Sequence, residues 1–355
     1  MGPATHFLLP ASHPEMLTRL FLPAAVAGLA LSLGLAPPAA GQAAPAGMAP
    51  PGRLVDIGGN RLHLWCTGAS APRRPTVVLS AGGGDFATDW SLVQLPLADS
   101  VRVCSYDRPG FGWSDPGPNP RTIRQEAFEL RSALTRSGES PPYLLVGHSI
   151  GSFVARWFAE TYGTEVAGVV LVEPTNENGK LGYRGQWVIP RLLATDRPVP
   201  AVRSLSESPP RPLPAAEADS CRARAERSAR IWRPYDRLRA QAQRYRVWAL
   251  QHPACMAYQD DYFAEEMAAF FNRWSAAAPP LGDLPLIVIQ GTRPRTPPPG
   301  MSLAEWKSDS LRLDLSRLSR RGRLVEDSLS GHHVQLDNPA LVVTLLRDLL
   351  RQFPN

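Results

Sequence analysis

Lysine is almost missing from this sequence, which contains only Lys180 and Lys307, so arginine supplies 36 of the 38 basic residues. The formal net charge of +6 therefore reflects an arginine-rich composition, typical of a GC-rich genome, rather than a basic surface selected for an anionic ligand. Nucleic-acid binding would need basic residues gathered on one face within a known module, and the sequence contains no such module. We therefore expect no nucleic-acid partner.

Long apolar runs are absent too, except near the N-terminus. Residues 20–36 form one such run, which follows Arg19 and precedes several small residues. This order is typical of a secretory signal peptide, so we expect a signal peptide and N-terminal extension at 1–43, a linker at 44–52, and a secreted or periplasmic protein with no stable membrane insertion. An N-terminal membrane anchor is the alternative, which Pro23 and the shortness of the run disfavour.

Cysteine is scarce, with four residues in the whole chain. An even number suits an oxidising compartment, and four cysteines permit three pairings. Cys66 and Cys104 lie in strand-like segments, whereas Cys221 and Cys255 share one helical region. This grouping favours the pairs Cys66–Cys104 and Cys221–Cys255, with four free buried thiols as the alternative.

Short β-branched and apolar runs alternate with amphipathic stretches after the linker. This alternation predicts an α/β fold, with a mostly parallel sheet flanked by helices. We expect strands at 61–66, 76–80, 101–106, 143–146, 169–172, 286–290 and 323–326, and helices at 122–137, 152–162 and 339–353.

The region 176–280 breaks this alternation. It has no strand-like run, and it holds long helical stretches at 215–251 and 260–277. We therefore expect a helical insertion at 176–280 within a core formed by residues 53–175 and 281–355.

The strongest local signal is GHSIG at Gly147–Gly151, which follows an expected strand and opens an expected helix. A serine on such a tight turn needs small neighbours, because a side chain at Gly147 or Gly151 would clash with adjacent elements. Ser149 would then be presented outward at the positive end of a helix. His148 is an ordinary occupant of its position in this motif, and we assign it no chemistry.

Three further segments occur in an order and spacing that fit this motif. They are SAGGGDFATDW at 80–90, YDRPGFGWSD at 106–115 and GHHVQLDNP at 331–339. With them the chain resembles the α/β-hydrolase superfamily, as a serine-nucleophile member of the esterase or lipase type. The segments resemble the family's oxyanion loop, the turn after its fourth strand and its histidine loop. The resemblance implies that 176–280 is a cap whose aromatic residues line an apolar pocket or pack the cap's own helices.

The resemblance assigns the general base to His332, which directly follows Gly331. Its imidazole would take the Ser149 proton and return it to the leaving group. His333 is the close rival, with a packing role as its other interpretation. An adjacent histidine pair also suggests a metal, but no carboxylate or cysteine cluster accompanies it at ligand spacing, so we predict no metal site.

An oxyanion needs donors, and the resemblance places them on the backbone N–H groups of Ile150 and of Gly83 in the glycine loop. A run of three glycines also suggests a phosphate loop. No Lys-Ser or Lys-Thr pair follows it, which argues against that alternative.

Members of the family complete a catalytic triad with a carboxylate that orients the histidine. The position of this carboxylate departs here from the commonest family pattern. Members usually carry an aspartate soon after the strand that here ends at Gln290, yet residues 291–300 contain no carboxylate. Some members place the acid at the end of the preceding strand, where this chain has Glu173. The order Ser149, Glu173, His332 then matches the family order, and Glu177 and Asp309 are the alternatives.

Together these residues predict a serine hydrolase that cleaves a small or medium carboxylic ester through an acyl-enzyme, without a cofactor. An aminopeptidase, amidase or acyltransferase on the same fold is the alternative among enzymes. A binding protein that keeps the fold without activity is the alternative from another class. The expected partner is a small ester-type molecule, and no pattern in the sequence indicates its identity or the oligomeric state.

Overall fold

The computed structural model describes residues 48–257, 261–274, 278–294 and 313–353. The predicted signal peptide at 1–43 and the first part of the linker lie outside the described residues, so both stay predictions. Among the helices that are described, none combines the length and apolar character that a membrane crossing requires.

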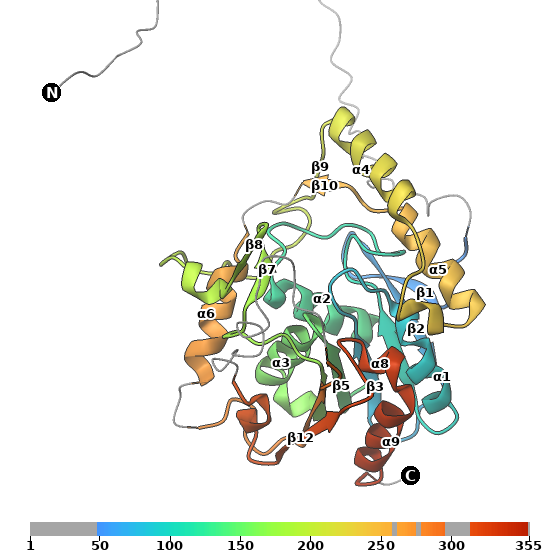
Figure 1. Ribbon diagram of the computed structural model, residues 1–355, viewed down its shortest axis with the longest axis vertical. Helices are drawn as coiled ribbons and strands as arrows, with labels where there is room; N and C mark the ends of the chain where they lie inside the picture. The colour runs from blue at the N-terminus through green and yellow to red at the C-terminus, as the bar shows by residue number, and fades with distance from the viewer. Residues whose placement is uncertain (1–47, 258–260, 275–277, 295–312, 354–355) are drawn as a thin grey trace, which may run out of the picture. The chain divides into compact units, whose positions relative to one another are not determined.

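An eight-stranded sheet forms the centre of the fold, in the order β1-β2-β4-β3-β5-β6-β11-β12 (Figure 1). Its strands are β1 (Arg53–Asp56), β2 (Arg61–Thr67), β3 (Thr76–Ser80), β4 (Val103–Tyr106), β5 (Tyr143–His148), β6 (Val166–Val172), β11 (Leu286–Gly291) and β12 (Gly322–Asp327). The pairs from β4 to β12 are parallel, while β1–β2 and β2–β4 are antiparallel. The predicted mostly parallel sheet is confirmed, and β1 is a strand that the sequence patterns did not indicate.

Helices cover both faces of this sheet (Figure 1). The helices of the core are α1 (Ser91–Ala98), α2 (Ile123–Arg136), α3 (Gly151–Thr161), α8 (Val334–Asp337) and α9 (Pro339–Leu350). Neighbouring residues of one strand point to opposite faces. Val78 accordingly belongs to the same buried cluster as Phe158 of α3, and Val77 to the cluster of Leu346 of α9. The sheet is therefore buried on both sides, which explains why its strands read as continuous apolar runs.

The described residues of the region 176–280 contain the helices α4 (Ala215–Ser228), α5 (Ala240–Gln251) and α6 (Phe263–Trp274). The single helical stretch predicted at 215–251 is thus two helices. A short 3₁₀ turn at Tyr235–Arg237 separates them, and Pro234 before it lacks the N–H group that a continuous helix needs.

Short strands also occur in this region, although the sequence shows no alternating pattern there. They form two antiparallel pairs, β7 (Leu181–Tyr183) with β8 (Gln186–Val188), and β9 (Arg211–Pro212) with β10 (Met256–Ala257). Strands of two or three residues are too short to leave a period in the sequence.

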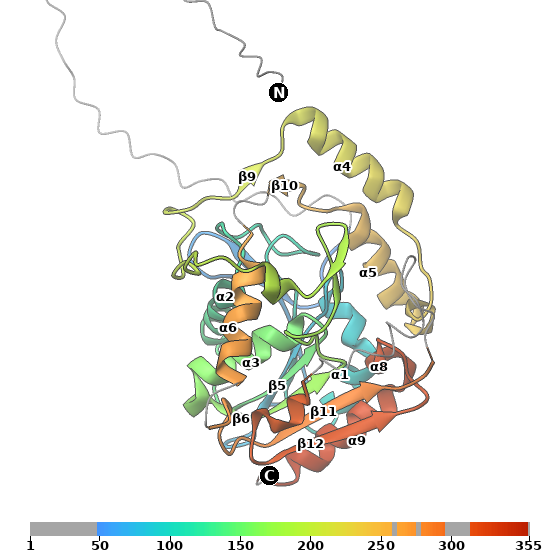
Figure 2. The ribbon, with the colours of Figure 1, turned by 60° about the vertical axis from the view of Figure 1, so that its left-hand side comes forward.

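The insertion contacts the core through several of its elements, and two of these contacts are made by helices α6 and α5. On one side Phe270 of α6 packs on Phe153 of α3, and Figure 2 shows these two helices close together. On the other side Trp248 of α5 stacks on Trp113, with ring centroids 4.6 Å apart.

Both predicted disulfides are present. Cys66 and Cys104 are direct partners on the antiparallel strands β2 and β4. Cys221 of α4 is joined to Cys255, which immediately precedes β10. One bond therefore crosslinks the sheet and the other crosslinks the insertion.

Candidate active site

Ser149 lies on a tight turn between β5 and α3, with a backbone φ of +51°. A non-glycine residue in this left-handed region is strained. A Cβ on Gly147 would lie 2.6 Å from the carbonyl oxygen of Gly151, and one on Gly151 would lie 2.6 Å from that of Ala81. The two glycines of GHSIG are thus required by the close approach of neighbouring backbone, as the sequence predicts.

His332 lies beside Ser149, in the loop between β12 and α8. Its Nε2 is 3.0 Å from Ser149 Oγ, and its Nδ1 is 3.2 Å from Glu173 Oε2. The His332 side chain is 41% exposed, whereas that of Glu173 is 3% exposed. The structure therefore brings the three residues Ser149, His332 and Glu173 into one hydrogen-bonded chain that is open to solvent at the imidazole.

Glu173 directly follows β6 and has a φ of +44°. Its backbone N–H donates to Ile289 of β11, and its Oε1 accepts a hydrogen bond of 2.7 Å from the N–H of Gly291. The second carboxylate oxygen is the one that faces His332. Glu173 thus lies at the end of β6, and its carboxylate contacts the end of β11 through one oxygen and the histidine loop through the other.

The alternative acids differ in their surroundings. Glu177 is fully buried and binds both terminal nitrogens of Arg156 at 2.8 Å. This pairing occupies both carboxylate oxygens, so the structure does not place Glu177 at His332. Asp309 lies outside the described residues.

The glycine loop approaches the residue after Ser149. A Cβ on Gly83 would lie 4.0 Å from Cδ1 of Ile150, so these two residues are neighbours. Within the described part of the chain, no backbone carbonyl accepts the N–H of either residue. Arg108 of the segment 106–115 donates to the carbonyl of Gly82 at 2.8 Å and holds the loop in place.

The fold and this geometry can be compared with known proteins. The family model of the alpha/beta hydrolase fold matches residues 75–339. The chain belongs to the α/β-hydrolase family. The resemblance recognised in its sequence motifs is confirmed.

One curated relative carries the name of this superfamily. An AB hydrolase superfamily protein of Gibberella zeae is 31% identical over 112 residues, which are 30% of this chain and 35% of that protein. The chain spans less than half the length of the first curated relatives that it matches.

Two solved structures share the hydrolase fold at low identity. An esterase from Thermogutta terrifontis has 19% identity and a TM-score of 0.52, and covers 82% of this chain and 94% of its own. The enol-lactonase from Burkholderia xenovorans has 18% identity and a TM-score of 0.53, and covers 84% of this chain and 100% of its own.

A buried polar network lies behind His332, the candidate general base. The imidazole of His148 contacts the His332 carbonyl through Nε2 at 2.8 Å and Asp85 Oδ2 through Nδ1 at 3.3 Å. Tyr235 donates to Asp85 Oδ1 at 2.5 Å, and its hydroxyl lies 2.9 Å from His333 Nε2. The structure thus engages His333 in this network and leaves the contact with Ser149 to His332.

Burial and charge set the protonation of this network. Burial lowers the pKa of His333 to about 3, and neighbouring His148 adds to the effect, so the His333 ring is neutral. Burial acts to raise the pKa of Asp85, but the hydrogen bond and charge of His148 hold that pKa well below its usual range. Asp85 is therefore an anion whose Oδ2 lies 3.3 Å from His148 Nδ1 and 3.9 Å from His333 Nε2.

Sequence reasoning missed Asp85, Tyr235 and Arg246 as members of this network. Arg246 of α5 forms an ion pair with Asp89 and lies 3.5 Å from Asp85. Asp85 and Asp89 both lie in the segment 80–90, whose resemblance to the oxyanion loop is the only feature of the sequence that pointed to this part of the network. Tyr235 and Arg246 belong to the insertion, where no local pattern distinguishes them from other helix residues.

Asp85, His148 and His333 offer ligand atoms within 4.8 Å of one another, a spacing at which a metal ion can bind. Asp85 is already engaged by Tyr235, and the guanidinium of Arg246 lies beside it. An added cation would be repelled by that guanidinium, so we interpret the cluster as a support for the histidine loop. The absence of a metal site stays a prediction.

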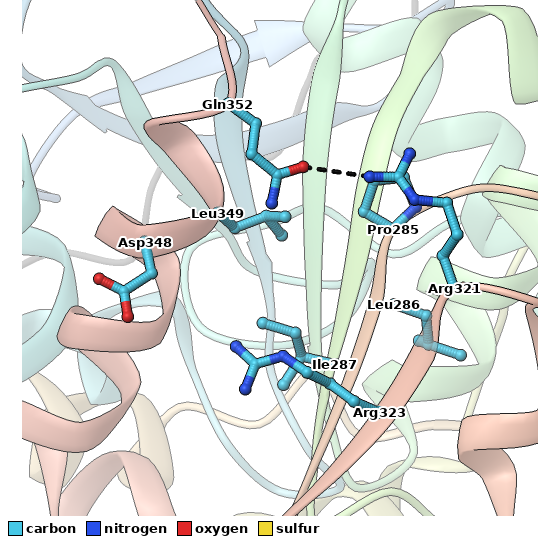
Figure 3. A pocket seen from close by; sticks show the side chains of 8 residues that line it. All are labelled: Pro285, Leu286, Ile287, Arg321, Arg323, Asp348, Leu349 and Gln352. Atoms are coloured by element: carbon cyan, nitrogen blue, oxygen red, sulfur yellow. Dashed lines mark hydrogen bonds between the residues drawn. The ribbon is translucent and has the colours of Figure 1, made fainter.

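Two cavities of the described residues lie in different parts of the fold. The first, of about 210 Å³, is lined by Leu286 and Ile287 at the beginning of β11, where Arg321 donates to Gln352 at 3.3 Å (Figure 3). This is the end of the strand opposite to Gly291, so the cavity is remote from Glu173. The second, of about 310 Å³, begins at Gly84, one residue after the candidate oxyanion residue.

Proposed function

We propose that the protein is a serine hydrolase that cleaves a small or medium carboxylic ester through an acyl-enzyme intermediate. Ser149 is the nucleophile, His332 the general base and Glu173 the acid of the triad. The observation that carries this proposal is the chain of contacts from Ser149 Oγ to His332 Nε2 at 3.0 Å and from His332 Nδ1 to Glu173 Oε2 at 3.2 Å.

The mechanism follows from the donors and acceptors of this chain. The Glu173 carboxylate accepts the Nδ1–H of His332, which leaves the Nε2 lone pair toward the Ser149 hydroxyl. His332 takes the hydroxyl proton as Ser149 attacks the ester carbonyl, and then gives that proton to the departing alkoxide. Water repeats the same steps on the acyl-enzyme and releases the acid. Glu173 stabilises the imidazolium that forms in each half of the reaction.

The tetrahedral intermediate carries an oxyanion, which needs donors in a preorganised position. The N–H groups of Ile150 and Gly83 fill this role in the proposal. Their proximity and their lack of a backbone acceptor within the described residues support it. Removing one such donor typically costs about a hundredfold in rate.

Two further assignments accompany this function. Residues 176–280 act as a cap over the site, supported by the contacts of α5 and α6 with the core. The protein acts outside the cytoplasm, and the two disulfides are compatible with such an oxidising compartment.

Hydrolysis of a panel of p-nitrophenyl esters tests the proposal. Ser149→Ala, His332→Ala and Glu173→Gln are compared with wild type, and Ser132→Ala on α2 and Glu226→Gln on α4 serve as matched controls away from the site. We expect kcat to fall by about a thousandfold or more in the first two variants, and by less in Glu173→Gln. A fluorophosphonate should label wild type and both controls but not Ser149→Ala.

Three results would contradict parts of the proposed function. Unchanged turnover in Glu173→Gln would remove Glu173 from the triad, and labelling of Ser149→Ala would remove the nucleophile. A folded wild type that neither reacts with the fluorophosphonate nor cleaves any ester would favour the inactive binding protein.

A further inference from the structure

A second hydroxyl lies beside the proposed nucleophile. Oγ1 of Thr175 is 3.4 Å from Oγ of Ser149, and Thr175 is buried. Within the described residues this hydroxyl has no other hydrogen-bond partner. Thr175 therefore contacts the oxygen that forms and breaks the bond to the acyl group, and neither the triad nor the oxyanion donors account for this contact.

The segment after β6 holds Thr175 in this position. The N–H of Thr175 donates to the backbone carbonyl of Ser149 at 3.3 Å. Two residues earlier, Glu173 is bonded to β11 through its N–H and its carboxylate. The next residue, Asn176, binds the backbone of Leu313 through both atoms of its side-chain amide. The hydroxyl thus has a fixed place beside Ser149, as a preorganised donor requires.

The positions of the protons decide which hydroxyl donates. In the proposed mechanism the Ser149 hydroxyl donates its proton to Nε2 of His332, 3.0 Å away. A hydroxyl has one proton and two lone pairs, so the hydroxyl of Thr175 is the donor and Ser149 Oγ the acceptor. At 3.4 Å this hydrogen bond is long for two hydroxyls. Such contacts in a free enzyme often shorten in the reacting complex.

This donor assists one step of the reaction more than the others. In deacylation the oxygen of water bonds to the acyl carbon, and the bond from that carbon to Ser149 Oγ then breaks. The electron pair goes to Oγ, which receives its proton from the His332 imidazolium. Thr175 keeps its own proton and stabilises the charge on Oγ until that transfer. In the acylation by a p-nitrophenyl ester, the departing p-nitrophenolate is a far better leaving group and needs no such donor.

We propose that Thr175 is a further catalytic residue, whose hydroxyl donates to Ser149 Oγ as this oxygen leaves the acyl group and thereby accelerates deacylation. This inference rests on the proposed function, because it concerns the acyl-enzyme formed at Ser149.

Pre-steady-state kinetics separate the two halves of the reaction. The burst of p-nitrophenolate from p-nitrophenyl butyrate reports acylation. The decay of the acyl-enzyme after removal of excess ester, followed by the mass of the intact protein, reports deacylation. Thr175→Val removes the hydroxyl at nearly constant volume, and Thr175→Ser keeps it. Thr344→Val, at an exposed position of α9, is the matched control.

We expect Thr175→Val to slow deacylation by about tenfold, as the loss of one donor to a charged oxygen predicts. The burst rate and kcat/KM, which report the steps up to acylation, should change little. Thr175→Ser and Thr344→Val should both resemble wild type. Thr175→Ala also removes the hydroxyl and should slow deacylation in the same way, which covers the case that Thr175→Val does not fold.

Two results would overturn the inference. One is an acyl-enzyme whose lifetime in Thr175→Val and Thr175→Ala equals that of wild type. The other is a parallel loss of the burst rate and of the deacylation rate, because this would show that the substitutions displace Ser149 instead of removing a donor to the departing oxygen.

The inference and the proposed function fail in different ways. A folded wild type that forms no acyl-enzyme at Ser149 would refute the proposed function and the role of Thr175 with it. An acyl-enzyme that forms at Ser149 and decays equally fast with and without the Thr175 hydroxyl would refute the role of Thr175 alone.

Discussion

The imidazole of His148 donates a hydrogen bond from Nε2 to the backbone carbonyl of His332, at a distance of 2.8 Å. A residue of the GHSIG turn thus holds the backbone of His332, the proposed general base for Ser149. Asp85 fixes the His148 ring from its other nitrogen. This contact gives His148 a positioning role, which its place in the motif did not indicate.

Loss of this contact should slow the reaction. We expect His148→Ala to lower kcat by about tenfold or more with little change in KM, because small displacements of a general base are costly. His148→Gln keeps an N–H donor and should restore part of the loss. Equal losses in the two variants would point to packing rather than positioning. Steady-state kinetics and the rate of fluorophosphonate labelling measure the loss in each variant.

Gly291 should tolerate no side chain. Its Cβ would lie 2.1 Å from the carbonyl oxygen of Gly331, the residue before His332. Gly291→Ala should therefore displace the histidine loop and lower kcat/KM by about a hundredfold. Gly163→Ala is the matched control, because a Cβ there meets nothing within 4 Å. Similar activities for these two variants would contradict the prediction.

Glu266 of α6 should make stability depend on pH. Burial raises its pKa to about 8, although the N–H groups of Ile123 and Arg124 donate to its carboxylate. Between its ordinary pKa of 4.5 and this value, the folded protein keeps a proton that the unfolded chain has released. The free energy of unfolding should therefore fall as pH rises through this window, by about 1.4 kcal/mol per pH unit from this group.

Glu266→Gln removes this titration but keeps an oxygen acceptor for the two N–H groups. We expect the variant to show a flatter dependence of stability on pH than wild type, with its largest relative gain near the upper end of the window. Urea unfolding at several pH values measures the slope. The exposed Glu226→Gln should leave it as in wild type, and a parallel curve for Glu266→Gln would disprove the assignment.

The two disulfides should stabilise different parts of the chain. Cys221 and Cys255 enclose 34 residues of sequence separation within the insertion, a loop for which crosslinking contributes about 3–4 kcal/mol. We expect Cys221→Ala with Cys255→Ala to accelerate limited proteolysis inside the insertion and to leave the sheet protected. Cys66→Ala with Cys104→Ala should lower Tm of the whole domain. Identical proteolysis patterns for the two double variants would contradict this division.

Much of the fold could be predicted because local chemistry and global structure agree there. The apolar runs of β3, β5 and β6 are buried on both faces, and Gly147 and Gly151 are required by close backbone contacts. Glu173 could be proposed because residues 291–300 lack a carboxylate. The hydrogen bond from Gly291, which fixes that carboxylate, depends on the neighbouring strand and leaves no mark in the sequence.

The rest depends on contacts between distant parts of the chain. Tyr235 is 150 residues from Asp85 in the sequence, and Arg246 is 157 residues from Asp89. No period or motif encodes such pairings. The break between α4 and α5 was missed for another reason, because the surrounding residues are good helix formers and Pro234 alone interrupts them.

The register of β5 and β6 pairs His148 with Val172, the residues that immediately precede Ser149 and Glu173. The spacing between the proposed nucleophile and acid is therefore set by the hydrogen bonds of the sheet, before the chain enters the insertion. The cavity of about 310 Å³ takes Leu213, Ala249 and Met256 of its lining from the insertion. Natural variation in the inserted segment can thus reshape this cavity while the distance between the proposed nucleophile and the proposed acid stays the same, so that the two can evolve separately.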